Sequence, residues 1–219
     1  MPFIKSGVLS SGRNTHIKPP ASQRLAGQPL TDVFTSASII NDFAKAKITA
    51  KKGTQLVKTK VFDKVTGEIK DAVFKIKKIG LMEQIFLKVD GKYYGDIELK
   101  YITPDLAKKD TVLQMRDYAK DGAVNIKWME SKCPGAGTML HQAAVLRSQE
   151  LGYSGRVTLE AKYNSHCFHY KSGFRPVGDD ADRQTAKILE AIKESKITGK
   201  RADTSHLGMI SMALHPVVQ

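Results

Sequence analysis

The sequence predicts one α/β (α+β) domain built on a mixed, mostly antiparallel sheet flanked by helices. Two observations predict this fold class. Residues 48–102 alternate apolar and polar side chains between glycine-containing turns, which indicates consecutive antiparallel strands. Residues 123–177 alternate short apolar runs with helical stretches, which indicates strand–helix–strand units. With 219 residues and 41% hydrophobic side chains, the chain can bury the core of one ordinary domain and still carry a tail.

The tail is expected at the N-terminus, as a flexible arm over residues 1–40, with the domain over 41–219. The arm is rich in Ser, Gly, Pro and Thr and has no sustained hydrophobic period. Its start lacks the apolar segment and cleavage site of a secretory signal, and no run approaches the roughly 20 apolar residues of a membrane helix. We expect a cytoplasmic protein without a membrane span; non-classical secretion through the arm has no support in the sequence.

The elements of the domain follow from alternation, helical stretches and turn residues. Asp90-Gly91 marks a hairpin, Thr103 and Pro104 mark a helix start, and Gly152 and Gly173 end helices. The expected order is strands 55–62, 72–79, 84–89 and 92–102, helix 106–120, strand 123–129, helix 135–151, strand 156–161, short helix 165–172, strand 174–177, helix 181–195 and strand 208–214.

The charge is strongly positive, at +13 with a pI of about 9.6, and it is unevenly distributed. Residues 45–120 carry 18 Lys and Arg against 10 Asp and Glu. The lysines alternate with apolar residues, as in residues 73–79, which is typical of the solvated faces of strands. This pattern disfavours nucleic-acid binding and leaves two interpretations: plain solvated faces, or a surface that recruits an acidic protein partner.

The loop 132–138, KCPGAGT, lies between a predicted strand and a predicted helix and is the most informative stretch. Glycines let the backbone approach a ligand, and the following helix start offers unpaired N–H groups, a combination that binds phosphate. The lysine of a nucleotide-binding P-loop is missing, and Leu140 replaces the third glycine of a dinucleotide fold. An ordinary strand-to-helix turn is the alternative.

The stretch 124–177 resembles the GNAT superfamily of acyl-CoA-dependent N-acyltransferases. Lys132, Gly135 and Gly137 fill the family's Gln/Arg-x-x-Gly-x-Gly/Ala pyrophosphate loop. A helix, a strand and a short helix ending in Gly173-Phe174 follow in the family's order, so the motif region is 123–178, about a quarter of the chain. Lysine in place of Gln/Arg is a departure, and Pro134 has no N–H to donate.

The resemblance implies an N-acyltransferase that moves an acyl group, acetyl in the simplest case, from acyl-CoA to an amine in a ternary complex without a metal. It also implies a strand end that separates from its neighbour, where Asn125, Ile126 and Lys127 would pair with the pantetheine arm. The amine acceptor, a protein or a small molecule, is not identified. The remaining implied cofactor contacts are main-chain N–H groups for the pyrophosphate and one side chain for the pantetheine: Lys132, Cys133, Gly135, Ala136, Gly137 and Thr138, and Asn164.

Catalysis needs a base for the ammonium proton and a source of a proton for the leaving thiolate. The resemblance assigns the base to Glu160, with Glu130 and Asp121 as weaker candidates and a solvated carboxylate as the alternative. The family's usual tyrosine position holds His169, with Tyr170 beside it, so either residue or water would supply the proton. The missing tyrosine motivates a second hypothesis, a non-catalytic acyl-CoA sensor or scaffold, and a third is a binder of nucleic acid or another anionic surface.

The cysteines support no further site. The chain has only two, Cys133 and Cys167, and this number excludes a disulfide framework and a four-cysteine zinc site. A hydrolase pairing Cys133 with His141, and zinc held near Cys167, are disfavoured by residue spacing. The single tryptophan, Trp128, is expected either to pack or to line an acceptor groove.

Overall fold

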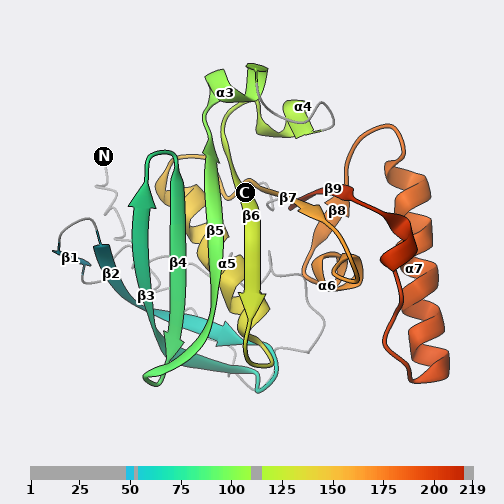
Figure 1. Ribbon diagram of the computed structural model, residues 1–219, viewed down its shortest axis with the longest axis horizontal. Coiled ribbons are helices and arrows are strands. Elements are labelled where there is room, and N and C mark those ends of the chain that lie inside the picture. The colour runs from blue at the N-terminus through green and yellow to red at the C-terminus, as the bar shows by residue number, and fades with distance from the viewer. Residues whose placement is uncertain (1–47, 52–53, 110–114, 215–219) are drawn as a thin grey trace, which may run out of the picture.

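The computed structural model describes residues 48–51, 54–109 and 115–214, with side chains described from residue 54 onward (Figure 1). Residues 1–47, 52–53, 110–114 and 215–219 lie outside this description, and the predicted arm 1–40 lies there with them.

Within the described residues the strands form one nine-stranded sheet of order β1-β2-β3-β4-β5-β6-β7-β9-β8. Every neighbouring pair is antiparallel except β6 and β7, which are parallel and are connected through a helix. The predicted fold class, a mixed and mostly antiparallel sheet flanked by helices, is confirmed. The strands are β1 (Ile48–Lys51), β2 (Thr54–Asp63), β3 (Glu68–Ile79), β4 (Met82–Val89), β5 (Lys92–Ile102), β6 (Ala123–Ser131), β7 (Val157–Ala161), β8 (Phe174–Pro176) and β9 (Ile210–Leu214).

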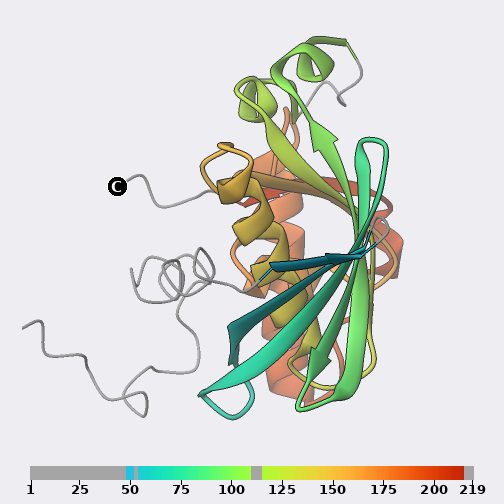
Figure 2. The same ribbon diagram turned by 90° about the vertical axis from the view of Figure 1, so that its left-hand side faces the viewer.

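The helices lie on one face, at one end and at one edge of this sheet (Figures 1 and 2). They are α3 (Pro104–Lys109), α4 (Arg116–Ala119), α5 (Ala136–Glu150), α6 (His166–Lys171) and α7 (Ala181–Thr198), with a 3₁₀ turn η3 (Ser205–Leu207). Thr103 accepts a hydrogen bond from the Leu106 amide at 3.3 Å, as expected of a helix cap. The prediction of one helix over 106–120 is wrong, since α3 and α4 are separate elements.

The core lies between the sheet and α5, and every residue from Ala136 to Ser148 is buried. Apolar side chains alternate along each strand toward this helix, as the period of two requires. Fully buried members include Phe74, Leu87, Leu99, Leu140 and Leu159. Burial of this kind stabilises by roughly 1.5–3 kcal/mol per large side chain, so packing on α5 fixes where the loop before it lies.

The hairpin of β2 and β3 bends under β4 and β5 until its turn reaches the start of α5 (Figure 1). Gln142 of α5 holds it there with both ends of its amide. The side-chain oxygen accepts from the Phe62 N–H at 2.9 Å, and the side-chain nitrogen donates to the Phe62 carbonyl at 2.8 Å. Both groups are buried, so these bonds satisfy backbone atoms that would otherwise lose their hydrogen bonds to water.

Candidate active site

The parallel strands β6 and β7 stop pairing soon after they begin. The register joins Val124 with Val157, Asn125 with Thr158 and Ile126 with Leu159, and no further pair is formed within the described residues. β6 continues to Ser131 against β5, while β7 continues to Ala161 against β9. A register irregularity between β5 and β6 leaves Lys127 unpaired at the same point, as in a β-bulge. From Lys127 to Ser131, β6 therefore has an edge that β7 does not cover.

The start of α5 lies at the open end of this strand pair, because α5 follows the C-terminal end of β6. Gly135 precedes the helix with a φ of +84°, a conformation that favours glycine. Among the described residues, the N–H groups of Cys133, Gly135 and Gly137 have no hydrogen-bond partner. Three free donors at a helix start, where the helix dipole is positive, form an arrangement that binds anions.

Three of the six predicted main-chain donors are already engaged. The Lys132 amide donates to the Tyr94 carbonyl at 2.9 Å and so extends the ladder between β5 and β6. The amides of Ala136 and Thr138 donate to Cys133 and Gly135 at 3.2 and 3.1 Å, within the first turn. The predicted donor set is therefore corrected to alternate residues, Cys133, Gly135 and Gly137.

The turn of the β2–β3 hairpin supplies side chains that the sequence did not associate with the loop. Asp63 lies so close to Gly135 that a Cβ there would be 2.8 Å from its Oδ1. Lys70 neutralises this carboxylate at 2.6 Å. Burial raises the pKa of Asp63, but hydrogen bonds from Lys70 and the Val65 amide outweigh it, and the pKa is lowered. Asp63 is thus a paired anion beside the loop.

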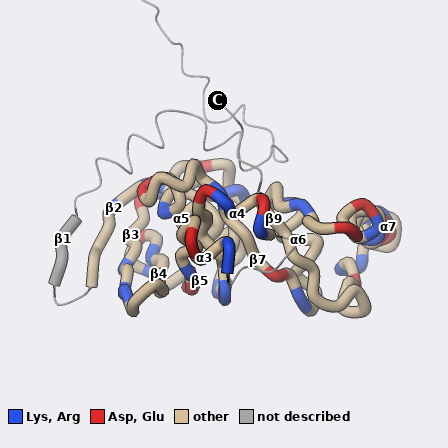
Figure 3. Tube along the Cα trace, turned by 90° about the horizontal axis from the view of Figure 1, so that it is seen from above, with Lys and Arg blue, Asp and Glu red and all other residues tan. Residues whose placement is uncertain are grey.

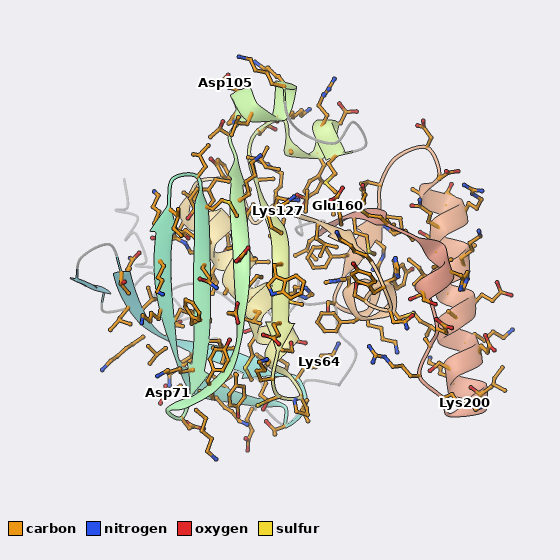
Figure 4. All side chains as sticks on the ribbon, viewed as in Figure 1. Lys64, Asp71, Asp105, Lys127, Glu160 and Lys200 are labelled. Carbon is orange, nitrogen blue, oxygen red and sulfur yellow. The ribbon has the colours of Figure 1, made fainter. Side chains whose placement is uncertain are left out.

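Lys64, in the same turn, reaches the opposite side of the loop, where its Nζ donates to the Lys171 carbonyl of α6 at 3.4 Å. Figure 4 places Lys64 below the C-terminal end of β6. Lys132 pairs with Glu130, so its charge is partly compensated. Lys64 thus lies between two residues that contact Gly135, Asp63 and Val65, and has no carboxylate partner among the described residues. Nothing in the local sequence signals it, since 70 residues separate the turn from the loop.

The predicted pantetheine contacts on β6 shift by one residue. Asn125 and Ile126 still lie in the part of β6 that pairs with β7, and the Asn125 side chain donates to Thr158 Oγ1 at 2.9 Å. This prediction is corrected: of the three residues, Lys127 is the one on the uncovered edge. Asn164 has a structural role, because its Oδ1 accepts from the Thr204 amide at 2.8 Å and holds the segment before β9.

Glu160 lies immediately beyond the paired part of β7. It is half-buried, stands opposite Ser211 of β9, and follows Leu159, the last residue paired with β6. Figure 4 shows Glu160 and Lys127 at the same height on the two strands that separate. The carboxylate is therefore placed where the uncovered edge of β6 begins, as a base acting there requires. Asp121 lies in the connection between α4 and β6. It is therefore at the N-terminal end of β6, opposite to the end that leads into the loop 132–138.

A small cavity lies beside Glu160's strand, between β8, β9 and the start of α7. Its volume is about 180 Å³, and its lining includes Asp179, Asp180, Gln184 and Ser211. The Oε1 atom of Gln184 is buried there without a hydrogen-bond partner among the described residues. The cavity is polar, and Ser211 joins it to the strand position opposite Glu160.

His169 does not fit the predicted role of proton donor. Its ring is buried, and Nδ1 lies 3.1 Å from Nε2 of His141 on α5, between the rings of Phe168 and Phe174. Burial lowers the pKa of His169 to about 3, with a further contribution from His166. A neutral imidazole that faces α5 is a weak acid directed away from the open strand edge, so the structure does not favour His169, and its role as proton donor stays a prediction. The sequence could not show which face of the short helix His169 occupies.

Tyr170, the alternative proton donor, lies on a different side of α6. It is partly buried against the core, and the Arg175 guanidinium stacks on its ring with 4.1 Å between the guanidinium carbon and the ring centroid. Arg175 also donates to the Tyr170 carbonyl at 2.9 Å. The assignment of Tyr170 as proton donor stays a prediction.

Three buried histidines make the fold sensitive to acid. His141 and His166 are fully buried and His169 nearly so, and burial lowers the pKa of each from 6.5. Below about pH 6.5 the unfolded chain therefore takes up protons that the folded chain does not. The free energy of unfolding should decrease as the pH is lowered. We expect His169 alone to lower the unfolding free energy by roughly 2 kcal/mol between pH 7 and pH 5, with His141 and His166 acting in the same direction.

Urea unfolding at several pH values measures this loss. His169→Phe keeps an aromatic ring and should flatten the pH dependence, whereas His206→Ala changes an exposed histidine and should not. Equal stability at pH 7 and pH 5 would contradict the burial of neutral imidazoles.

The remaining cysteine and metal hypotheses find no support. His141 Nε2 is engaged with His169, and Cys133 lies in the loop with half-buried exposure, so no Cys–His pair is formed. His166 uses both ring nitrogens, on Thr204 Oγ1 and the Gly208 carbonyl. In the described part of the chain, no group of three His, Cys, Asp or Glu residues is placed to hold a metal ion. The described helices likewise include none that is long and apolar enough to cross a membrane.

Comparisons with known proteins add little to this geometry. No protein-family model matches the sequence, and no curated protein matches it. A solved structure of an acyl-CoA N-acyltransferase from Pseudomonas aeruginosa is similar at 15% identity and a TM-score of 0.36, covering 63% of this chain and 70% of that chain. A likeness at this level carries no argument about the activity of this chain.

Proposed function

We propose that this protein is an acyl-CoA-dependent N-acyltransferase, which moves an acyl group, acetyl in the simplest case, to an amine by direct attack. The observation that carries the proposal is the separation of β6 from β7 at the point where α5 begins. It leaves an uncovered strand edge from Lys127 to Ser131 beside the free amides of Cys133, Gly135 and Gly137. A pantetheine arm can pair with such an edge, and a pyrophosphate can bind such amides.

In the proposed reaction the amine nitrogen attacks the thioester carbonyl carbon, the C–N bond forms, the C–S bond breaks, and CoA leaves as the thiolate. Glu160 takes the proton of the ammonium, whose pKa of about 10.4 otherwise keeps the nitrogen unreactive at neutral pH. Tyr170 or water returns a proton to the thiolate. Lys64 adds a positive charge next to the phosphate-binding amides.

Ligand-induced stabilisation tests the site. We expect millimolar acetyl-CoA to raise the melting temperature of the wild-type protein, because a ligand that binds only the folded state stabilises it. Gly137→Glu places a carboxylate at the free amides and should abolish the shift, weakening binding roughly tenfold or more. The matched control is Ala186→Glu, which adds the same charge on an exposed position of α7 and should leave the shift intact.

A Cβ at residue 137 would lie 2.7 Å from Phe168 Cζ, so the melting temperature of Gly137→Glu without ligand checks that the variant folds. No stabilisation of the wild-type protein by millimolar acetyl-CoA contradicts the proposal.

The second candidate function is a non-catalytic acyl-CoA sensor or scaffold. The burial of His169 favours it, because the position that usually supplies a proton donor in similar enzymes faces α5 instead. Thioester turnover with a panel of amines separates the two functions. Stabilisation by acetyl-CoA without turnover of any amine supports the sensor.

A further inference from the structure

One face of the sheet has no helix over it in the described part of the chain. α5 packs on the face that carries Phe74, Leu87 and Leu99, and Figure 2 shows the strands β3–β5 with α5 on that side alone. The alternation along each strand sends the other side chains to the opposite face, here called the open face. Its members on β2–β6 are Leu56, Lys58, Lys60, Asp71, Val73, Lys75, Lys77, Met82, Gln84, Phe86, Lys88, Tyr93, Asp96, Glu98, Lys100, Asn125, Trp128 and Glu130.

The charges on the open face are sorted by strand, and Figure 3 shows basic positions recurring along β3 and β4. On β2–β4 the face carries five lysines and one acid, Asp71, which pairs with Lys60 at 2.8 Å. Lys58, Lys75, Lys77 and Lys88 are exposed and form no ion pair with a described residue. The middle of β5 and the end of β6 instead carry three acids: Glu98, Asp96, which is buried, and Glu130, which pairs with Lys132.

The strand register shows that the charge of the open face changes from positive on β3 to negative on β5 and β6. One row runs Lys75, Phe86, Asp96, Glu130 from β3 to β6, and the next runs Lys77, Gln84, Glu98, Trp128. Neighbouring strands lie about 4.8 Å apart, so the lysines of β3 are about 10 Å from the acids of β5 and about 14 Å from Glu130 and Trp128 of β6. Trp128 is 56% exposed, which leaves its ring available to a cation beside Glu98. On β6 the first row ends in Glu130 and the second in Trp128, and the uncovered edge of β6 belongs to the proposed site.

From this gradient we infer that the amine acceptor is a partner protein with an acidic segment, which docks on the lysines of β2–β4 and presents its amine near Trp128. The inference rests on the proposed function and names its substrate class. Charge complementarity carries it: an acidic segment matches the basic half, and a cationic amine about 14 Å away matches the acidic half.

Two other occupants match the face less well. Residues 1–47 of this chain carry Lys and Arg at six positions and Asp at two, so they would be repelled by the lysines. A single-stranded nucleic acid needs basic side chains around its stacking aromatic residues. Here Trp128 and Tyr93 lie among Asp96, Glu98 and Glu130, and the Tyr93 hydroxyl is bonded to Asp96.

Fluorescence anisotropy with a labelled, Asp/Glu-rich peptide containing one lysine tests the inference. The wild-type protein should bind it with an affinity that falls with salt, and should not bind a peptide with Asn/Gln in place of Asp/Glu. The variant K75E/K77E/K88E should bind the acidic peptide about tenfold more weakly or worse. The control K187E/K193E/K196E makes the same charge change on exposed positions of α7 and should bind nearly as wild type.

Each outcome decides one question. Equal losses in both triple variants, or no binding of the acidic peptide, overturn the inference, and so does tighter binding of a single-stranded oligonucleotide of equal charge. Stabilisation by acetyl-CoA should be unchanged in both variants, since the changed lysines lie away from the loop 132–138. Peptide binding without acetyl-CoA stabilisation would overturn the proposed function and leave the docking surface standing, whereas the reverse would overturn only the surface.

Discussion

Replacing Glu160 by glutamine should lower kcat/KM for amine acylation by about 10²–10⁴-fold at neutral pH. A positioned general base contributes an effect of this size, and glutamine keeps the shape of the side chain while losing its basicity. The loss should shrink as pH rises toward the pKa of the acceptor amine, because the amine then loses its proton without help. A role in folding alone would not produce this pH-dependent recovery.

The kinetics are measured with acetyl-CoA and the best amine of the panel across a pH series. Glu190→Gln, at an exposed position of α7, is the matched control and should leave kcat/KM unchanged. Melting with acetyl-CoA should show that Glu160→Gln still binds the co-substrate. An unchanged kcat/KM in Glu160→Gln would remove this residue from the mechanism and turn attention to Glu130.

Breaking the buried ion pair of Glu83 and Arg147 should cost about 3–5 kcal/mol of unfolding free energy. Arg147 of α5 donates to both carboxylate oxygens of Glu83 on β4, at 2.9 and 2.7 Å, and to the Tyr101 hydroxyl at 3.1 Å. The Glu83 side chain is 2% exposed, so Glu83→Gln leaves the buried guanidinium without its buried counter-charge and with only the exposed Glu150 as a partner. For a chain of this size, the melting temperature should fall by roughly 6–20 °C.

Two further variants separate the buried pair from ordinary surface charge. Arg147 also pairs with Glu150, which is 43% exposed, and Glu150→Gln should cost about 1 kcal/mol or less. Replacing both buried partners, as E83M/R147M, should restore much of the stability, because no unpaired charge stays buried. A Glu83→Gln protein as stable as Glu150→Gln would contradict a buried, mutually neutralising pair.

Local patterns in the sequence predict most of the fold. Alternation gives the strands of residues 54–102 to within two residues, except that β3 begins at Glu68, four residues before the predicted start, and the glycines at 135 and 152 bracket α5 as expected. These features depend on neighbours in the chain. The predicted helix 106–120 is the exception, since local signals at Thr103 and Gly122 mark its ends but not the break between α3 and α4.

The site is less accessible to such reasoning, because it depends on contacts between distant segments. The loop was predicted to bind phosphate through six amides. The Lys132 amide is instead hydrogen-bonded to β5, and the amides of Ala136 and Thr138 are hydrogen-bonded within the first helical turn. The position of His169 depends on the rotation of a helix of six residues, a length at which no hydrophobic period can be read. Lys64 and Asp63 reach the loop through the curvature of a hairpin that pairs with β4, far from α5 in sequence.

The two hydrogen bonds between Gln142 and Phe62 also limit how the chain can be divided. The stretch 123–178 carries the motif, yet the buried Gln142 amide of its central helix is bonded to the backbone of Phe62. Gly135, in the same stretch, packs against Asp63. An excised fragment of that stretch would expose the β5 side of β6 and would lack the Phe62 backbone groups that bond the Gln142 amide. The motif stretch is therefore not expected to fold by itself. The β2–β3 hairpin forms part of the site together with the loop 132–138.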